Sequence, residues 1–295
     1  MKKIIGVILL SAIVTACGDA NIQYIRKAVR FMDIFGIYAE GPEWEAAKKE
    51  ALAARPASLE EAQSITRATG RVAGGKHTFV MTAGRVQEDD EAEWEMPSVE
   101  QLDGGILLIK LPPFSGNSEE GTKYANTVLD AIPDTPQGVV LDLRGNRGGN
   151  MYPMIAAVHR FLPDDILLKF RTRRRTMMIN KEHVTATAGV GLQPRIECPV
   201  ALLTNEGTGS SGEATLLCFR GLNYARTFGA ATAGYASTNQ TFKLPDGSQL
   251  VLTIGEDVAR TGEVFCDDPI EPDVTTDTPL EAALEWIQSY NELVI

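Results

Sequence analysis

The residues best suited to chemistry lie in the segment Thr208–Glu213, which reads TGSSGE. Ser210 follows the apolar run Val200–Thr204 and precedes a second apolar run, so the pattern predicts a turn from a strand into a helix. A serine on such a turn can act as a nucleophile, and the helix N-terminus behind it favours negative charge on an oxyanion. The same letters also fit the capping pattern S-x-x-E, so a purely structural role as a helix cap stays open.

A second candidate segment is Leu141–Gly149, where a predicted strand ends in a charged, glycine-rich turn. Adjacent glycines allow backbone N–H groups to face a cavity, which is what an oxyanion hole requires. The alternatives are a phosphate-binding loop, or a buried pair of Asp142 and Arg144 beside ordinary turn glycines. Neither the dinucleotide-binding nor the P-loop spacing is present, so nucleotide binding is disfavoured.

A serine nucleophile needs a base, and the sequence offers three histidines. His159 lies in a predicted helix and His183 in a polar stretch, so we interpret them as a structural and a surface residue. His77 follows a glycine pair between the N-terminal segment and the predicted strands. A lone histidine of this kind more often has a structural role, so the residue pattern alone leaves its function open.

An alternation of strands and helices must position these segments. Strands are predicted over residues 106–109, 138–143 and 200–204, helices over 119–131, 152–162, 212–222 and 280–287, and a hairpin over 242–254. This alternation predicts a layered α/β core. Residues 20–75 are predicted to be helical, because apolar side chains recur at helical spacing and Ser58–Glu61 forms a capping box. The acidic segment 84–104 is predicted to be an irregular, solvated loop.

The N-terminus has the pattern of an export signal. Lys2 and Lys3 precede the apolar stretch Ile4–Val14, which is too short to span a bilayer as a helix. The stretch ends in VTAC, which resembles a bacterial lipobox, so Cys17 is expected to be lipidated after removal of residues 1–16. An ordinary secretory signal is the alternative. We therefore expect an extracytoplasmic protein anchored to a bacterial membrane, on the periplasmic side or at the cell surface.

Charge and cysteine content narrow the function classes. The formal net charge of -11 argues against nucleic-acid binding, which needs a basic surface. Cys198 and Cys266 are the pair that we would test for a disulfide, whereas Cys218 is expected to be a buried thiol. No cysteine or histidine spacing indicates a metal site. The basic run Arg171–Arg175 fits a protected edge strand, with binding of a substrate carboxylate as the alternative.

These segments together resemble the C-terminal processing (tail-specific) serine peptidases. Residues 139–149 resemble their D-L-R-x-N-x-G-G signature, and residues 210–213 resemble their nucleophile motif. Residues 228–234 match their G-x-x-T-x-G turn, and residues 245–247 and 270–273 match their D-G and P-D landmarks. The resemblance extends from about residue 22 to residue 288.

The resemblance implies a fold and a domain organisation. The implied fold is α/β, with a layered core of a mixed sheet and flanking helices (ClpP/crotonase-like) plus a small N-terminal helical unit. We expect that unit over residues 17–80, an acidic linker or cap over 81–104 and the peptidase core over 105–295. Many relatives carry a PDZ domain before the core, but only about 26 residues separate His77 from Gly104 here, which is too few.

The resemblance also implies the catalytic residues. The branch that uses a Ser–Lys dyad has lysine where this chain has Tyr235, so that mechanism is disfavoured. The branch that includes the tricorn core and the nisin-resistance peptidase pairs serine with histidine, which makes His77 the implied base for Ser210. Its acidic partner is placed by that branch near Asp267.

The same reading implies an oxyanion hole formed by the backbone N–H of Ser211 with that of Gly148 or Gly149. The side chain of Ser211 is expected to be dispensable. The implied substrate is a peptide or protein tail, with no metal or cofactor. The alternatives are a non-catalytic peptide- or ligand-binding lipoprotein of the same fold, and a resistance factor that cleaves one antimicrobial peptide.

Overall fold

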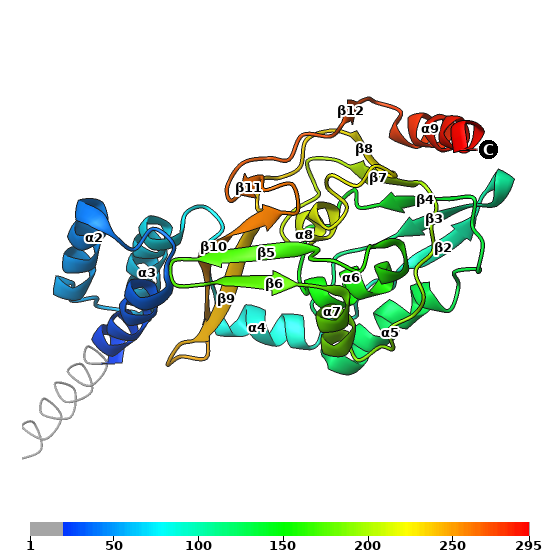
Figure 1. The fold of residues 1–295 in the computed structure, drawn as a ribbon. Helices are drawn as coiled ribbons and strands as arrows, with labels where there is room; N and C mark the ends of the chain where they lie inside the picture. Colours follow the sequence, from blue (N-terminus) through cyan, green and yellow to red (C-terminus); the bar gives the residue numbers. More distant parts are fainter. Residues whose placement is uncertain (1–19, 295) are drawn as a thin grey trace, which may run out of the picture. The chain divides into compact units, whose positions relative to one another are not determined.

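The computed structural model describes residues 20–294 (Figure 1), so Cys17 and the predicted signal peptide lie outside the described part. The described chain forms two compact units. The first contains residues 20–88 and 238–255, and the second contains residues 89–237 and 256–294. Strand β10 (Gln249–Ala259) passes from one unit to the other. No helix within residues 20–294 combines the length and the apolar character needed to cross a membrane.

The first unit joins helices to a small antiparallel sheet. Its helices are residues 20–35, α2 (Gly41–Ala53), α3 (Leu59–Gly74) and most of α4 (Ala83–Asp90). Its strands are β1 (Phe79–Met81), most of β9 (Ser237–Lys243) and the first part of β10. The predicted N-terminal helical region is confirmed. The Ser58 hydroxyl accepts a hydrogen bond from the Glu61 N–H at 3.1 Å, as the capping pattern predicts.

Apolar burial explains why the β9–β10 hairpin folds with the helices. Phe242 of β9 stacks on Phe31 and Phe35, with ring centroids 4.5 and 5.1 Å apart. Leu250 and Leu252 of β10 are fully buried in the same cluster as the helical side chains. Burying such side chains contributes about 1.5–3 kcal/mol each. The hairpin therefore belongs to the first unit, although we predicted it within the segment assigned to the peptidase core.

The second unit is built on a sheet in the order β12-β8-β7-β4-β3-β2. Its strands are β2 (Ser98–Gln101), β3 (Ile106–Lys110), β4 (Gly138–Asp142), β7 (Val200–Thr204), β8 (Ala225–Gly229) and β12 (Val274–Thr275). Strand β2 pairs antiparallel with β3, and the other pairs are parallel. The carboxyl ends of β4 and β7 therefore lie at the same edge, where the two candidate loops begin.

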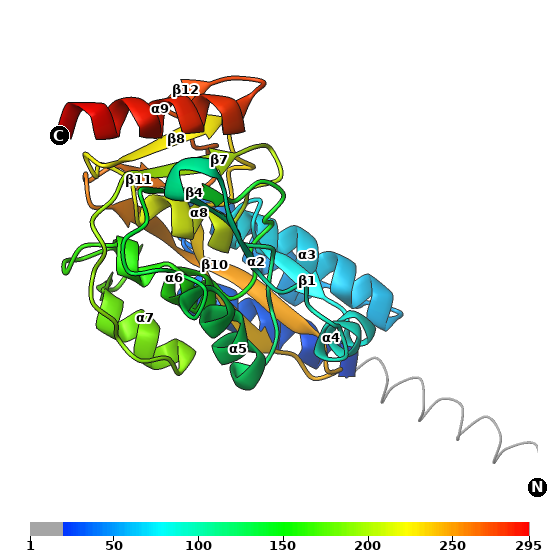
Figure 2. The ribbon, with the colours of Figure 1, turned by 90° about the vertical axis from the view of Figure 1, so that its right-hand side faces the viewer.

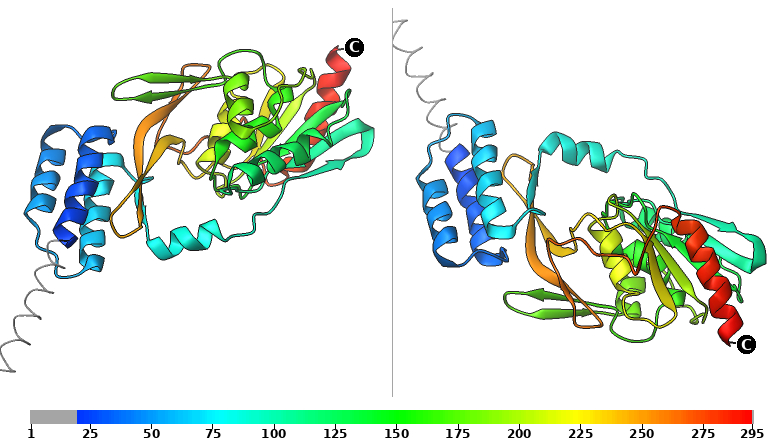
Figure 3. Two further views of the ribbon diagram at one scale, coloured as in Figure 1. Left: turned by 90° about the horizontal axis from the view of Figure 1, so that it is seen from below. Right: turned by 90° about the horizontal axis from the view of Figure 1, so that it is seen from above.

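Helices cover both faces of this sheet (Figures 2 and 3). Val139 and Leu141 of β4 pack in one cluster with α5 (Ser118–Leu129), α6 (Met151–Ala157) and α8 (Ser211–Leu217). Val140, between them, packs on the other face with Ala283 and Ile287 of α9 (Pro279–Val294). Successive side chains of a strand point to opposite faces, so a strand buried on both faces is apolar throughout. This layered arrangement confirms the predicted α/β class.

The remaining elements of the second unit are a hairpin, a helix and a short strand. The hairpin consists of β5 (Leu168–Thr172) and β6 (Thr176–Ile179), and it is followed by α7 (Lys181–Ala188). Strand β11 (Val264–Phe265) pairs with the end of β10. The run Arg171–Arg175 thus occupies the tip of the β5–β6 hairpin. Arg171 Nε and Nη2 both donate to Glu256 Oε2, at 2.8 and 2.6 Å, so this guanidinium already binds an acid of its own chain.

One expectation from the sequence is wrong. The segment 84–104 is not irregular throughout, because it contains α4 and β2. Its apolar side chains, Trp94, Met96 and Val99, alternate with charged ones and pack against the core of the second unit. Cys198 and Cys266, the pair that we would test for a disulfide, are both thiols in the structure, and Cys218 is a buried thiol, as expected. Burial raises the pKa of Cys198 and of Cys218 to about 12, which makes both thiols unreactive.

Candidate active site

Ser210 has an unusual backbone conformation. It lies between β7 and α8, with φ 52° and ψ -116°. Among residues 20–294 it is the only residue other than glycine with positive φ. A helix-capping serine normally has extended backbone angles, so capping alone does not explain this geometry. A conformation of this kind costs about 1–3 kcal/mol and persists only where its surroundings impose it, most often at functional sites.

The fully buried carboxyl group of Glu213 imposes part of this conformation. Its Oε2 accepts hydrogen bonds from the N–H of Ser210 and of Tyr235, both at 2.8 Å. Its Oε1 accepts from the Gly234 N–H at 2.9 Å and from the Thr232 hydroxyl. Burial raises the pKa of Glu213, and the four donors oppose that rise by favouring the ionised form. Glu213 therefore ties the backbone of Ser210 to the turn that ends at Gly234.

Asn146 organises the second candidate loop and is also fully buried. Its Nδ2 donates to the Leu111 carbonyl and its Oδ1 accepts from the Gly148 N–H, both at 2.9 Å. Its carbonyl accepts from the Gly209 N–H at 2.8 Å. One asparagine thus fixes the glycine-rich loop and joins it to the residue before Ser210. The motifs did not reveal this role of Asn146, although the asparagine of the D-L-R-x-N-x-G-G signature marks the position.

The Asp142–Arg144 pair that we considered as an alternative does form. The Arg144 guanidinium makes a bidentate ion pair with the Asp142 carboxylate, with Nε–Oδ1 and Nη2–Oδ2 distances of 2.9 and 2.7 Å. The Arg144 N–H also donates to Oδ1 at 3.0 Å. This pair fixes the start of the loop. It does not replace the active-site interpretation, because Gly148 of the same loop packs against Ser210.

Gly148 lies directly against the candidate nucleophile. It has φ 102°, and a Cβ atom added there would lie 2.6 Å from Ser210 Cβ and 2.9 Å from the Ser211 nitrogen. Any side chain at this position would collide with Ser210 and with the Ser211 backbone nitrogen. The absence of a side chain at Gly148 thus leaves room for a small group beside both serines.

Gly149 is held between two segments. The Phe114 N–H donates to the Gly148 carbonyl at 3.2 Å, and the Asn150 N–H donates to the Phe114 carbonyl at 2.6 Å. On the other side, the Ser211 hydroxyl donates to the Gly149 carbonyl at 2.7 Å. Gly149 has φ 121°, and a Cβ there would overlap the Phe114 carbonyl oxygen. Within the described residues, the N–H groups of Gly149 and Ser211 donate to no protein acceptor, whereas those of Gly148 and Asn150 do.

The three histidines have different environments. His159 is fully buried; its Nδ1 lies 2.6 Å from the Ala156 carbonyl, and its Nε2 accepts from the Gln193 N–H at 2.9 Å. Both ring nitrogens are therefore engaged in the neutral form, as expected of a structural histidine. His183 is exposed in α7, as the sequence analysis predicted.

His77 lies in the first unit, in the turn between α3 and β1, and is 8% exposed. Its carbonyl lies 3.4 Å from Asn239 Nδ2. The hydroxyl of the next residue, Thr78, accepts from the Thr253 N–H at 3.0 Å, which fixes the turn on β10. Burial, with a smaller effect of the Lys76 charge, lowers the pKa of His77 to about 4. The imidazole is therefore neutral at pH 7, as a general base must be.

Asp267, the acid that the resemblance implied, lies half-buried in the second unit between β11 and β12. The nearby Ile270 N–H donates to the Thr232 hydroxyl at 2.8 Å, so this segment is joined to the same turn as Glu213. In the described part of the chain, no group of three or more His, Cys, Asp or Glu side chains is arranged to hold a metal ion.

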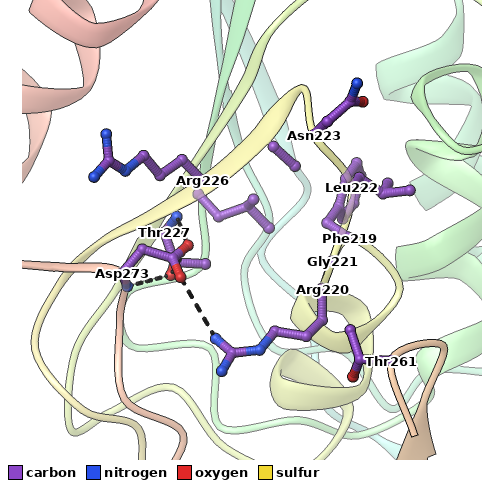
Figure 4. Close-up of a pocket in the computed structure, with 11 residues that line it drawn as sticks. Phe219, Arg220, Gly221, Leu222, Asn223, Arg226, Thr227, Thr261 and Asp273 are labelled. Atoms are coloured by element: carbon purple, nitrogen blue, oxygen red, sulfur yellow. Dashed lines mark hydrogen bonds and ion pairs between the residues drawn. The ribbon is translucent and has the colours of Figure 1, made fainter.

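A hollow of about 570 Å³ lies elsewhere in the second unit, beside the start of β8 (Figure 4). Arg220 lies 2.9 Å from Glu263 and 3.7 Å from Asp273, and Asp273 also accepts from the N–H and hydroxyl of Thr227. Arg226 extends away from this cluster (Figure 4). The hollow is at the amino end of β8, whereas Ser210 follows the carboxyl end of β7, so the two are different places on the sheet.

Comparison with known proteins decides the family. Residues 105–276, which include Ser210 and the glycine-rich loop, match the profile of Peptidase family S41. The chain belongs to that family. The match makes it a serine-type peptidase, and it agrees with the tail-specific peptidase resemblance of its motifs.

Individual S41 relatives cover most of the chain. It is 32% identical to the nisin-resistance protein of Lactococcus lactis subsp. lactis, over 90% of this chain and 87% of that protein. It is 26% identical to a probable CtpA-like serine protease of Staphylococcus aureus, over 71% of this chain but only 42% of that protein.

Solved structures share the fold. A lipoprotein from Streptococcus agalactiae superimposes with a TM-score of 0.84 at 30% identity, covering 92% of this S41 chain and 97% of that one. The photosystem II D1 C-terminal processing protease superimposes with a TM-score of 0.62 at 14% identity, covering 90% and 97%. The second likeness shows the fold alone.

Proposed function

We propose that this S41 peptidase is a lipid-anchored, extracytoplasmic enzyme that cleaves peptides or protein tails with Ser210 as nucleophile and His77 as base. The observation that carries the proposal is the strained backbone of Ser210, held by Glu213 against the glycine-rich loop. A binding protein has no need to maintain that strain, whereas a nucleophile on a sharp turn does.

In the proposed reaction, Ser210 Oγ attacks the peptide carbonyl carbon while His77 accepts the hydroxyl proton. The C–N bond then breaks, and His77 gives that proton to the leaving amine. A water molecule, deprotonated by His77, attacks the carbonyl carbon of the acyl-enzyme. The ester C–O bond then breaks, His77 gives its proton to Ser210 Oγ, and the acid is released. Asp267 is the proposed partner that orients the imidazole.

The oxyanion is assigned to the N–H groups of Ser211 and Gly149. Both are without a protein acceptor in the described residues, while the Gly148 N–H is bonded to Asn146 Oδ1. Gly148 has a different proposed role, because its missing side chain leaves the space in front of the Ser211 N–H. A preorganised donor of this kind is worth about 10²–10³ in kcat.

Labelling with a fluorophosphonate probe tests the nucleophile. The wild-type protein should be labelled and should cleave peptides, and Ser210→Ala should lose both properties while keeping its melting temperature. A non-catalytic binding protein of the same fold would not be labelled. Labelling that persists in Ser210→Ala would assign the nucleophile to another residue.

A second candidate function is resistance to one antimicrobial peptide. It is favoured by the 32% identity, over 90% of the chain, to a protein named for resistance to nisin. Purified enzyme should then cleave nisin faster than unrelated peptides of the same length, and Ser210→Ala should cleave neither. Equal rates on nisin and on unrelated peptides would favour the broader tail-cleaving function.

A further inference from the structure

The hydroxyl of Ser211 joins the two loops of the candidate active site. Ser211 is the first residue of α8, directly after Ser210, and is 8% exposed. Its Oγ donates to the Gly149 carbonyl oxygen at 2.7 Å. The motif alone implied that this side chain is dispensable, and the contact with Gly149 gives a reason to expect otherwise.

This contact completes the restraint on Gly149. Phe114 holds the neighbouring peptide groups through the Gly148 carbonyl and the Asn150 N–H. The Gly149 carbonyl itself has no other donor within residues 20–294. A glycine has wide backbone freedom, and Gly149 has φ 121°. Loss of this bond would leave the Gly149–Asn150 peptide plane held only at its N–H end, through the bond from Asn150 to Phe114.

We propose that the Ser211 side chain is a positioning residue that sets the oxyanion hole by holding Gly149 at a fixed place beside Ser210. The inference rests on the proposed function, since it assumes that the Gly149 N–H binds the oxyanion. Ser211 then acts twice, through its backbone N–H as a donor and through its hydroxyl as the link to the second donor.

The test compares Ser211→Ala with the matched pair Ser211→Thr and Ser211→Val, which differ from each other in the hydroxyl alone. Active sites are counted by fluorophosphonate titration, so that misfolded enzyme does not enter kcat. Ser211→Ala and Ser211→Val should lose about tenfold in kcat, with KM within about twofold, because one hydrogen bond to a catalytic loop is lost. Ser211→Thr should retain most of kcat.

A peptide aldehyde gives a second readout, since its adduct with Ser210 places an oxygen in the oxyanion hole. Its affinity should fall in Ser211→Val by the same factor as kcat/KM, as expected for a transition-state analogue. Binding of an uncleaved peptide to the same variant should change by less than about twofold. A merely structural role would weaken both ligands together or neither, and would overturn the proposal.

Hydrogen exchange separates this proposal from the proposed function. The Asn150 amide should exchange faster in Ser211→Ala and Ser211→Val than in wild type and Ser211→Thr, whether or not the protein turns over peptide. If the four proteins differ in exchange in this way but wild type is neither labelled nor able to cleave peptide, the link between the loops stands and the assigned role in catalysis fails. Equal kcat and equal exchange in Ser211→Val and Ser211→Thr would overturn the proposal itself.

Discussion

At the residue scale, the candidate active site consists of the nucleophile Ser210 and of the side chains that hold the backbone around it. Ser210, Ser211 and Glu213 are close in the sequence, and the motif identified them together. Their individual roles became distinct only in three dimensions: Glu213 fixes the Ser210 backbone, and Ser211 binds Gly149. A motif records which residue types occur, whereas the partner of each hydrogen bond depends on the fold of distant segments.

The pH dependence of turnover tests the proposed base. Burial lowers the pKa of His77 to about 4, and the protonated imidazole cannot accept the Ser210 proton. Turnover should therefore be full at pH 7 and fall only as the pH drops toward about 4, well below the ordinary histidine range near 6.5. The logarithm of kcat/KM, measured between pH 3.5 and 8, should be level down to about pH 5 and should bend downward as the pH approaches 4.

Two variants control that experiment. His77→Ala should lose about 10²–10⁴ in kcat and with it the acidic limb. Tyr235→Phe, which alters the residue at the lysine position of the Ser–Lys branch, should keep the limb. An acidic limb that survives in His77→Ala, or that disappears in Tyr235→Phe, would contradict the Ser–His assignment.

At the element scale, the two loops at the carboxyl ends of β4 and β7 form one structure. The Gly209 N–H donates to the Asn146 carbonyl, and the Ser211 hydroxyl donates to the Gly149 carbonyl. Gly148 packs directly against Ser210. Because β4 and β7 are neighbouring parallel strands, the loops that follow them begin side by side. No pattern in the sequence of either loop indicates that the two loops are in contact. The pairing of these strands therefore decides which loops meet.

Gly148→Ala tests the space between these loops. Its methyl group would lie 2.6 Å from Ser210 Cβ and 2.9 Å from the Ser211 nitrogen, so it should block the oxyanion and cost at least about 100-fold in kcat. Gly145→Ala is the matched control, because Gly145 also has positive φ, 72°, but nothing lies within 4 Å of its added Cβ. Both variants incur a backbone cost of about 1–2 kcal/mol, visible in their melting temperatures. A similar loss of kcat in both variants would mean that backbone strain, not steric blocking, is responsible.

Much of the core was predictable from its strands and helices. The strand predicted over residues 200–204 coincides with β7. The strand predicted over residues 138–143 is one residue longer than β4, which ends at Asp142. These runs are apolar because both faces of the sheet are covered, which leaves a strong signal. The helix over 152–162 was predicted as one element but ends at Ala157, before a 3-10 turn over His159–Phe161. Apolar periodicity over so few residues does not distinguish an α-helix from a 3-10 helix.

At the scale of the whole molecule, the division into units could not be predicted. Residues 238–255 fold with the N-terminal helices, although they lie between segments of the second unit in the sequence. The apolar pattern over residues 242–254 predicted a hairpin, but it does not say which core the hairpin joins. Phe242 shows why: its partners are Phe31 and Phe35, about two hundred residues earlier, and no local pattern encodes that contact.

The proposed lipid anchor is a property of the whole molecule and is tested at Cys17. Acyl chains bind a bilayer through about 0.8 kcal/mol per buried CH₂ group. Cys17→Ser should therefore abolish palmitate labelling and release the protein from the membrane fraction. Peptidase activity per molecule should be unchanged, because every proposed site residue lies between His77 and Asp267.

Ser210→Ala is the reciprocal control, which should stay membrane-bound and inactive. Equal palmitate labelling of wild type and Cys17→Ser would refute the anchor and leave the peptidase assignment intact.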